Sequence, residues 1–361
     1  MPFDAPTLIL SESERSSRRE ARAVALWLLG VAGLVWIMVA LGGATRLTGS
    51  GLSIMEWAPL SGALPPLSEA EWQRLYDLYR GIPQYALLNQ GFGLEGFKGI
   101  FWLEWLHRQW GRLIGLAYGG GLLWLWVSGR IPAGCKPRLL GLLALGGLQG
   151  AIGWYMVASG FDADRTAVSP YRLVVHLGLA LVIFCGLLWT ALDLLRPVPA
   201  APATARPVRR MVLAALWSLV AAMLAGGFVA GTRAGFTWNS FPLMDGQWLP
   251  AGLLALDPWW RNLTANLLTV QFNHRVLATV AALAAAGAVW AGWRHLPHGP
   301  ARRAVFGLGA AVALQYALGV ATLLYAVPVA LGTLHQATAV LVLSAALVAL
   351  HALRPQSGRS A

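Results

Sequence analysis

Charged residues are scarce in this chain of 361 residues, since Asp, Glu, Lys and Arg together make up 12% of it. Hydrophobic residues make up 57%, and the mean hydropathy is +0.59. Soluble domains contain about 25% charged residues, so the composition excludes that class and predicts an all-α polytopic membrane protein. The 18 tryptophans agree with this, because tryptophan gathers at membrane–water interfaces.

Cysteine is also rare, and Cys135 and Cys185 are too far apart in the sequence to predict a cysteine-ligated metal site. Acidic residues are few, which leaves a net charge of +12. A basic protein can attract nucleic acid. Here the basic residues are distributed by loop, as membrane topology requires, so we expect membrane lipid and no nucleic acid as a partner.

Eight apolar runs each approach the roughly 20 residues that a bilayer demands. They are residues 24–43, 102–127, 139–157, 171–192, 211–231, 266–291, 304–326 and 331–353. An even number of spans places both termini on one side. Residues 1–23 lack the apolar core of a signal peptide. With these residues inside, 16 of the 27 basic residues face inward, so we expect both termini in the cytosol.

An internal repeat divides the chain. After the first span comes Gly42-Gly-Ala-Thr-Arg46, and after the fifth come Gly226-Gly227 and Thr232-Arg233. Two further spans share a Leu-Gln-x-Ala-x-Gly pattern, at 148–153 and 314–319. The prediction is eight transmembrane helices arranged as two pseudo-twofold-related four-helix bundles. The bundles are 24–196 and 211–353, joined by an inner linker, 197–210, with a cytosolic tail at 354–361.

Four histidines occupy equivalent places in the second, fourth, sixth and eighth spans: His107, His176, His274 and His335. A single membrane histidine is more often a packing group than a ligand. Four at one depth, repeated by the internal symmetry, favour two haem sites, each with one axial imidazole from either side. Zinc is a weaker alternative, because two ligands are too few for a structural site.

Arginines flank these histidines near the outer ends of the spans: Arg46, Arg108, Arg112, Arg172, Arg233 and Arg275. Charge-assisted hydrogen bonds to haem propionates are one role for them, and interfacial anchoring is the other. The propionate role is most expected of Arg108 and Arg275, which each follow a histidine directly.

The two predicted sites differ at one position. Aligning His107 with His274 places Glu104 opposite Gln271. A carboxylate one helical turn from an imidazole can accept protons or orient a reactant, whereas an amide only forms hydrogen bonds. The first half is therefore predicted to perform chemistry on a bound molecule, and the second to hold a permanent haem.

Several motifs together resemble the haem A synthase family, type 2, the proteobacterial and mitochondrial-like branch. They are the Gly-Gly-Ala-Thr-Arg run at 42–53, Glu104-x-x-His107-Arg108, Phe-Asn-His274-Arg275 and Leu-His335-Gln. The resemblance covers residues 24–353. It implies an oxidoreductase that converts the C8 methyl of haem O to a formyl group through a hydroxymethyl stage. The product is haem A for cytochrome oxidase assembly.

The resemblance also implies the site. His274 and His335 would bind the iron of a permanent haem b, and His107 and His176 the iron of the substrate haem O, with Glu104 as catalytic residue. It implies the bacterial inner membrane, haem O synthase and cytochrome oxidase assembly factors as partners, and leaves a homo-oligomer open. Some members have a cysteine pair in the first outer loop, which this chain lacks.

Two other functions remain open at this point. A non-catalytic di-haem b-type electron carrier would share the four histidines and would not need Glu104. A transporter with parallel repeats would place polar residues at mid-membrane, whereas here they lie near the outer ends of the spans.

Overall fold

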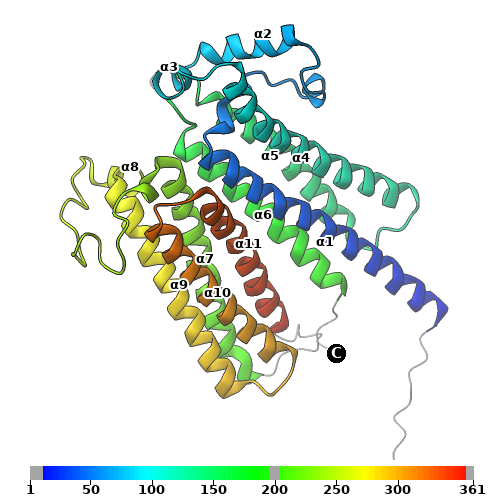
Figure 1. The fold of residues 1–361 in the computed structure, drawn as a ribbon. Coiled ribbons are helices and arrows are strands. Elements are labelled where there is room, and N and C mark those ends of the chain that lie inside the picture. The colour runs from blue at the N-terminus through cyan, green and yellow to red at the C-terminus, as the bar shows by residue number, and fades with distance from the viewer. Residues whose placement is uncertain (1–10, 164, 196–202, 355–361) are drawn as a thin grey trace, which may run out of the picture.

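The computed structural model describes residues 11–163, 165–195 and 203–354, and within them it is helical, with one isolated bridge and no strand. The long helices pack along one another, and shorter ones lie at one end (Figure 1). The long helices are α1 (Glu12–Leu47), α4 (Leu94–Val127), α5 (Lys136–Ala158), α6 (Pro170–Leu195), α7 (Arg206–Thr232), α9 (Leu267–His295), α10 (Pro300–Leu324) and α11 (Val329–Ala352).

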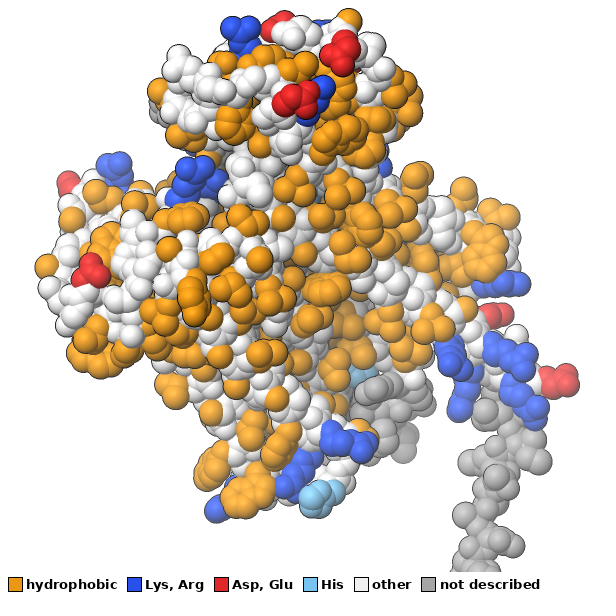
Figure 2. All heavy atoms as spheres, in the orientation of Figure 1, with side chains coloured by type: hydrophobic (Ala, Val, Ile, Leu, Met, Phe, Trp, Pro, Cys, Tyr) orange, Lys and Arg blue, Asp and Glu red, His pale blue; other side chains and the backbone are white. Residues whose placement is uncertain are grey.

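Each predicted span matches one of these helices to within two residues at its ends or lies inside it, and seven of the helices are long and apolar enough to cross a membrane. This confirms an all-α polytopic membrane protein. The remaining long helix, α4, is not among the seven and carries Glu95, Lys98, Glu104, Arg108 and Arg112 in its outer half, so the eighth span stays a prediction. Figure 2 shows hydrophobic side chains over the middle of the visible face and Lys and Arg side chains mostly toward its ends.

The predicted domain boundaries stay predictions, but α1 begins inside the expected tail. The expected tail 1–23 is helical from Glu12 onward, because its Glu, Arg and Ala residues favour helix and extend α1 beyond the apolar run. Residues 1–10, 197–202 of the linker and 355–361 of the tail lie outside the described residues. The rest of the linker forms a short turn, η3 (Ala203–Ala205), and the start of α7.

The long helices contact one another in a repeated order. In the first set α1 packs on α4 and α6, and α5 packs on both α4 and α6. In the second set α7 packs on α9 and α11, and α10 packs on both α9 and α11. Between the sets, α1 packs on α11 and α6 on α7. Each contact thus has a counterpart four spans later in the chain.

Hydrogen bonds from side chains to backbone carbonyls stabilise the contact between α1 and α11. Trp36 Nε1 donates to the Ala337 carbonyl at 2.9 Å, and Gln336 Nε2 donates to the Val39 carbonyl at 2.9 Å. Gly43 makes this close approach possible, because a Cβ there would lie 2.8 Å from Gln336 Oε1. The glycine is therefore required where the two sets meet.

The segment between α1 and α4 forms a small aromatic cluster outside the long helices. It contains α2 (Glu69–Arg80) and α3 (Pro83–Leu88). Ser68 caps α2 by accepting from the Glu71 amide at 3.2 Å. Its buried face packs on the start of α4 through Trp72, Tyr76, Tyr79, Phe97 and Phe101. This packing positions the outer segment over the polar half of α4.

Candidate functional site

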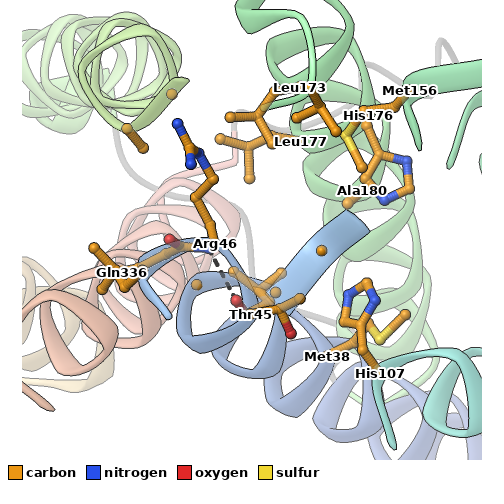
Figure 3. Close-up of a pocket in the computed structure, with 18 of the residues that line it drawn as sticks. Met38, Thr45, Arg46, His107, Met156, Leu173, His176, Leu177, Ala180 and Gln336 are labelled. Carbon is orange, nitrogen blue, oxygen red and sulfur yellow. Dashed lines mark hydrogen bonds between the residues drawn. The ribbon is translucent and has the colours of Figure 1, made fainter. Parts of the chain in front are cut away.

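A cavity of about 1450 Å³ runs between the long helices and is lined by both sets of four. A pocket for one small ligand measures about 300–1,000 Å³, so this cavity has room for more than one. All four histidines singled out by the sequence line it: His107, His176, His274 and His335. Figure 3 shows the imidazoles of His107 and His176 at one side of the cavity, beside Met38 and Ala180.

His274 and His335 face each other across α9 and α11. Their ring centroids lie 6.5 Å apart and the ring planes are nearly perpendicular, at 85°. His274 Nδ1 lies 2.9 Å from the Ala222 carbonyl oxygen, which only accepts, so Nδ1 carries the proton and Nε2 has a free lone pair. The gap suits two metal–nitrogen bonds of about 2 Å each.

A glutamine of the neighbouring helix contacts the second histidine of each set. Gln315 Nε2 lies 3.1 Å from His335 Nδ1 and donates to the His335 carbonyl at 2.9 Å. Gln149 Nε2 lies 3.2 Å from His176 Nδ1 and donates to the His176 carbonyl at 3.1 Å. The sequence analysis noted these glutamines only as part of the repeat and did not predict their contact with the histidines. Their equivalent positions in the two halves were the signal of a shared role.

A glycine of a neighbouring helix also lies against each histidine ring. A Cβ on each glycine would approach the ring closely, at Gly42 with His107 (3.3 Å), Gly153 with His176 (3.0 Å), Gly226 with His274 (3.0 Å) and Gly319 with His335 (2.8 Å). Any larger residue would displace the ring. The cavity therefore holds four imidazoles in places that only glycine leaves free.

The histidines come in pairs rather than in larger ligand groups. Within the described ranges, no three His, Cys, Asp or Glu side chains gather in a way that could hold a bare metal ion. An iron whose other ligands belong to a macrocycle needs only two axial imidazoles. The residues present thus fit haem.

Glu104 lies on the cavity wall and is 2% exposed. Its Oε2 accepts from Ser53 Oγ at 2.7 Å and from the Ile54 amide at 2.9 Å. Its Oε1 accepts from Arg108 Nε and Nη2 at 3.1 and 2.8 Å. Both oxygens are therefore held by donors, one of them charged, which fixes the carboxylate in one position.

Gln271, the counterpart of Glu104, is equally buried but sits among acceptors. Its Nε2 donates to the Ala234 carbonyl at 2.8 Å and also to the Thr237 carbonyl, and its Oε1 accepts from Arg275 at 2.8 Å. The outer loop of the first half thus offers donors to a carboxylate, and that of the second offers carbonyls to an amide. The difference between the two sites extends to their surroundings.

Arg108 and Arg275 hold the outer loops. Arg108 donates to the carbonyls of Ile54 and Glu56, the latter at 2.7 Å, and Arg275 donates to the carbonyls of Trp238 and Ser240. Both line the cavity, and Arg275 Nε is buried without a partner. Their expected role in binding propionates stays a prediction.

An ion pair outside the long helices supports the same loop. Arg74 donates to both oxygens of Glu56 at 2.8 Å and to both of Glu71. These hydrogen bonds lower the pKa of the Glu56 and Glu71 carboxyls below their usual range. Glu56 itself lines the cavity and its carbonyl accepts from Arg108, so the ion pair lies at the cavity wall.

Comparison with known proteins gives one consistent result. The sequence pattern of the family COX15-CtaA, described as "Cytochrome oxidase assembly protein", matches residues 25–347. The chain is 55% identical to "Heme A synthase" of Granulibacter bethesdensis over 95% of this chain and 90% of that protein. It is 48% identical to that of Rhodospirillum centenum (97% and 94%) and 47% identical to that of Parvibaculum lavamentivorans (92% and 94%).

Proposed function

The chain belongs to the COX15-CtaA family of cytochrome oxidase assembly proteins and acts as a haem A synthase, and we propose that it oxidises the C8 methyl group of haem O. The oxidation proceeds through a hydroxymethyl stage to a formyl group. The product, haem A, serves cytochrome oxidase. The resemblance seen in the motifs around the four histidines is confirmed by these relatives.

The membrane arrangement is part of the proposal. α4 is the eighth span, and its charged outer half is compatible with the membrane because Arg108 neutralises Glu104 and loop carbonyls accept from Arg112. The two sets of four helices form pseudo-twofold-related bundles, which the repeated helix contacts support. The basic inner loops support cytosolic termini in a bacterial inner membrane.

Each bundle holds one tetrapyrrole. His274 and His335 bind a permanent haem b, and their facing rings and the proton on His274 Nδ1 support this assignment. His107 and His176 bind the iron of the substrate. Bound iron supplies one-electron chemistry in both bundles, and the helices exclude bulk water from it.

Glu104 is the residue that distinguishes the substrate bundle. Its carboxylate accepts protons that leave the substrate as the methyl group is oxidised. Ser53, Ile54 and Arg108 hold it at the cavity wall, so that it is oriented before the substrate arrives. Gln271 cannot take this role, which leaves the second bundle to electron transfer. We further propose that haem O synthase delivers the substrate and that assembly factors receive the product.

One observation supports different roles for the two bundles. Loop donors surround the Glu104 carboxylate, whereas loop carbonyls accept from the Gln271 amide nitrogen. The test is pigment extraction from cells that make haem O and depend on this chain for haem A. Glu104→Gln is expected to accumulate haem O and keep haem b in the purified protein. Ser53→Ala is the control, because it removes one hydrogen bond and leaves the carboxylate.

Two results would count against this role. One is haem A at the normal level in Glu104→Gln. The other is an equal loss of haem A in Ser53→Ala and Glu104→Gln, which would make the loop contact rather than the carboxylate decisive.

A further inference from the structure

Arg46 and Arg233 occupy equivalent places at the border between the two sets of helices. Arg46 is in the last turn of α1, and Arg233 follows the last residue of α7, with a φ of 62°. Both line the cavity that contains the four histidines. Figure 3 shows the Arg46 side chain extending toward α7 and away from His107.

Among the residues that the structure describes, neither guanidinium has an acidic partner. Arg46 makes one side-chain hydrogen bond, from Nη2 to the Gly231 carbonyl at 3.0 Å, and its Nε is buried without a partner. Arg233 makes no side-chain hydrogen bond or ion pair with any residue that the structure describes. Arg46 reaches the carbonyl of Gly231, two residues before Arg233, so the two charges lie close enough to repel each other. Arg46 is half-buried, so an anion that joins it to the exposed Arg233 would offset the cost of burying its charge.

The acids that line the cavity are already paired with other arginines. Glu56 accepts both hydrogen bonds of a fork from Arg74, and Glu104 is paired with Arg108 at 2.8 Å. No carboxylate of the described cavity wall remains for Arg46 or Arg233. An anion that joins the two arginines would therefore come from a ligand.

The other arginines that line the cavity form hydrogen bonds with the protein itself. Arg108, Arg112 and Arg275 each donate to two or more carbonyls of the outer loops. Arg46 and Arg233 are different, because most of their N–H groups face no acceptor. A guanidinium with free N–H groups matches a carboxylate in charge and in geometry.

We propose that Arg46 and Arg233 form a carboxylate-binding site for the propionate side chains of a tetrapyrrole at the border between the two bundles. This rests on the proposed function, which places tetrapyrroles in the cavity. Because each arginine comes from a different half, the site contacts whichever tetrapyrrole extends its propionate to the border. A tetrapyrrole bound in this way has a fixed orientation in the cavity, because its propionates point to the border and the opposite edge of its ring points away from the border.

The test compares two probes on the full-length protein in lipid nanodiscs after removal of bound haem. The probes are iron protoporphyrin IX and its dimethyl ester, which lacks the negative charges. The variants are Arg46→Gln, Arg233→Gln and the double variant. Arg261→Gln is the matched control, because it removes one charge from an outer loop and does not line the cavity.

The wild type and the control are expected to bind the free acid more tightly than the ester, and each cavity variant to lose affinity for the acid by about tenfold or more. Affinity for the ester should stay unchanged. Repeating the titration with His107→Ala and with His274→Ala identifies which tetrapyrrole supplies the carboxylate, and loss of the acid preference in either background supports the site.

Three outcomes separate the possible failures. Equal affinity for acid and ester in the wild type overturns the carboxylate site, as does an unchanged acid preference in the double variant. A parallel loss for both probes also overturns it, because the arginines then support only the fold. A wild type that binds neither probe contradicts the proposed function itself.

Discussion

Glu104 and Gln271 occupy equivalent turns of α4 and α9, are each 2% exposed, and meet loops of opposite polarity. The Ile54 amide donates to Glu104, whereas the Ala234 carbonyl accepts from Gln271. Exchanging the residues therefore places like groups against each other. The two sites therefore differ in the surrounding loop as well as in the residue itself.

Gln271→Glu is expected to destabilise the protein by about 1–3 kcal/mol, because a buried carboxylate oxygen would then face the carbonyls of Ala234 and Thr237. The measurement is the thermal unfolding midpoint in detergent. Gln315→Glu is a control in which the same change is made beside a histidine instead of a loop. An unchanged midpoint in Gln271→Glu would show that the loop polarity does not matter.

Gly319→Ala is expected to lower the haem b content of the purified protein to a small fraction of normal. The new Cβ would lie 2.8 Å from His335 Cε1, which forces the ring to move. Gly307→Ala on the same helix meets nothing within 4 Å and should keep its haem, with stability equal to or slightly above the wild type. Full haem b in Gly319→Ala would contradict the proposed place of the ring.

Gln336→Leu tests the repeat where α1 meets α11. Leu177 is the counterpart of Gln336 and lies beside Gly227, at 3.3 Å from a Cβ built there. A leucine should therefore fit at position 336, and losing the bond to the Val39 carbonyl should cost about 1 kcal/mol. Gly227→Val, by contrast, should destabilise the protein more strongly, by about 1–3 kcal/mol, because its Cβ would lie 3.0 Å from a Val174 methyl carbon. Thermal unfolding distinguishes the two, and equal effects would argue against the equivalence.

Acidic pH is expected to loosen the outer segment. Arg74 lowers the pKa of Glu56 and Glu71, so the ion pairs contribute fully above the ordinary carboxyl pKa of about 4.3 and are lost as the pH falls through the lower folded values. The contribution is at most about 1 kcal/mol, since the groups are exposed. Protease cleavage between 56 and 74 should rise with acidification in the wild type. Arg74→Gln should show a high rate already at neutral pH, and identical pH profiles would contradict the account.

Much of this arrangement follows from the sequence. Apolar runs of bilayer length predict the long helices. Histidines at one depth predict two haem sites, and the structure places all four histidines on one cavity. Hydropathy does not reveal where α1 and α4 begin, because their polar ends form helix outside the apolar run. The carbonyls that accept from Arg108 and Arg275 belong to irregular loops, whose backbone course depends on packing and turns rather than on a periodic pattern.

The division of the four histidines into a permanent and a substrate pair is the central claim. Haem extraction and the absorption spectrum of the purified full-length protein test it most directly, with one histidine replaced by alanine at a time. The account predicts that His274→Ala and His335→Ala lose haem b, whereas His107→Ala and His176→Ala keep haem b and lose conversion of haem O. A full haem b spectrum in His274→Ala and His335→Ala would contradict it.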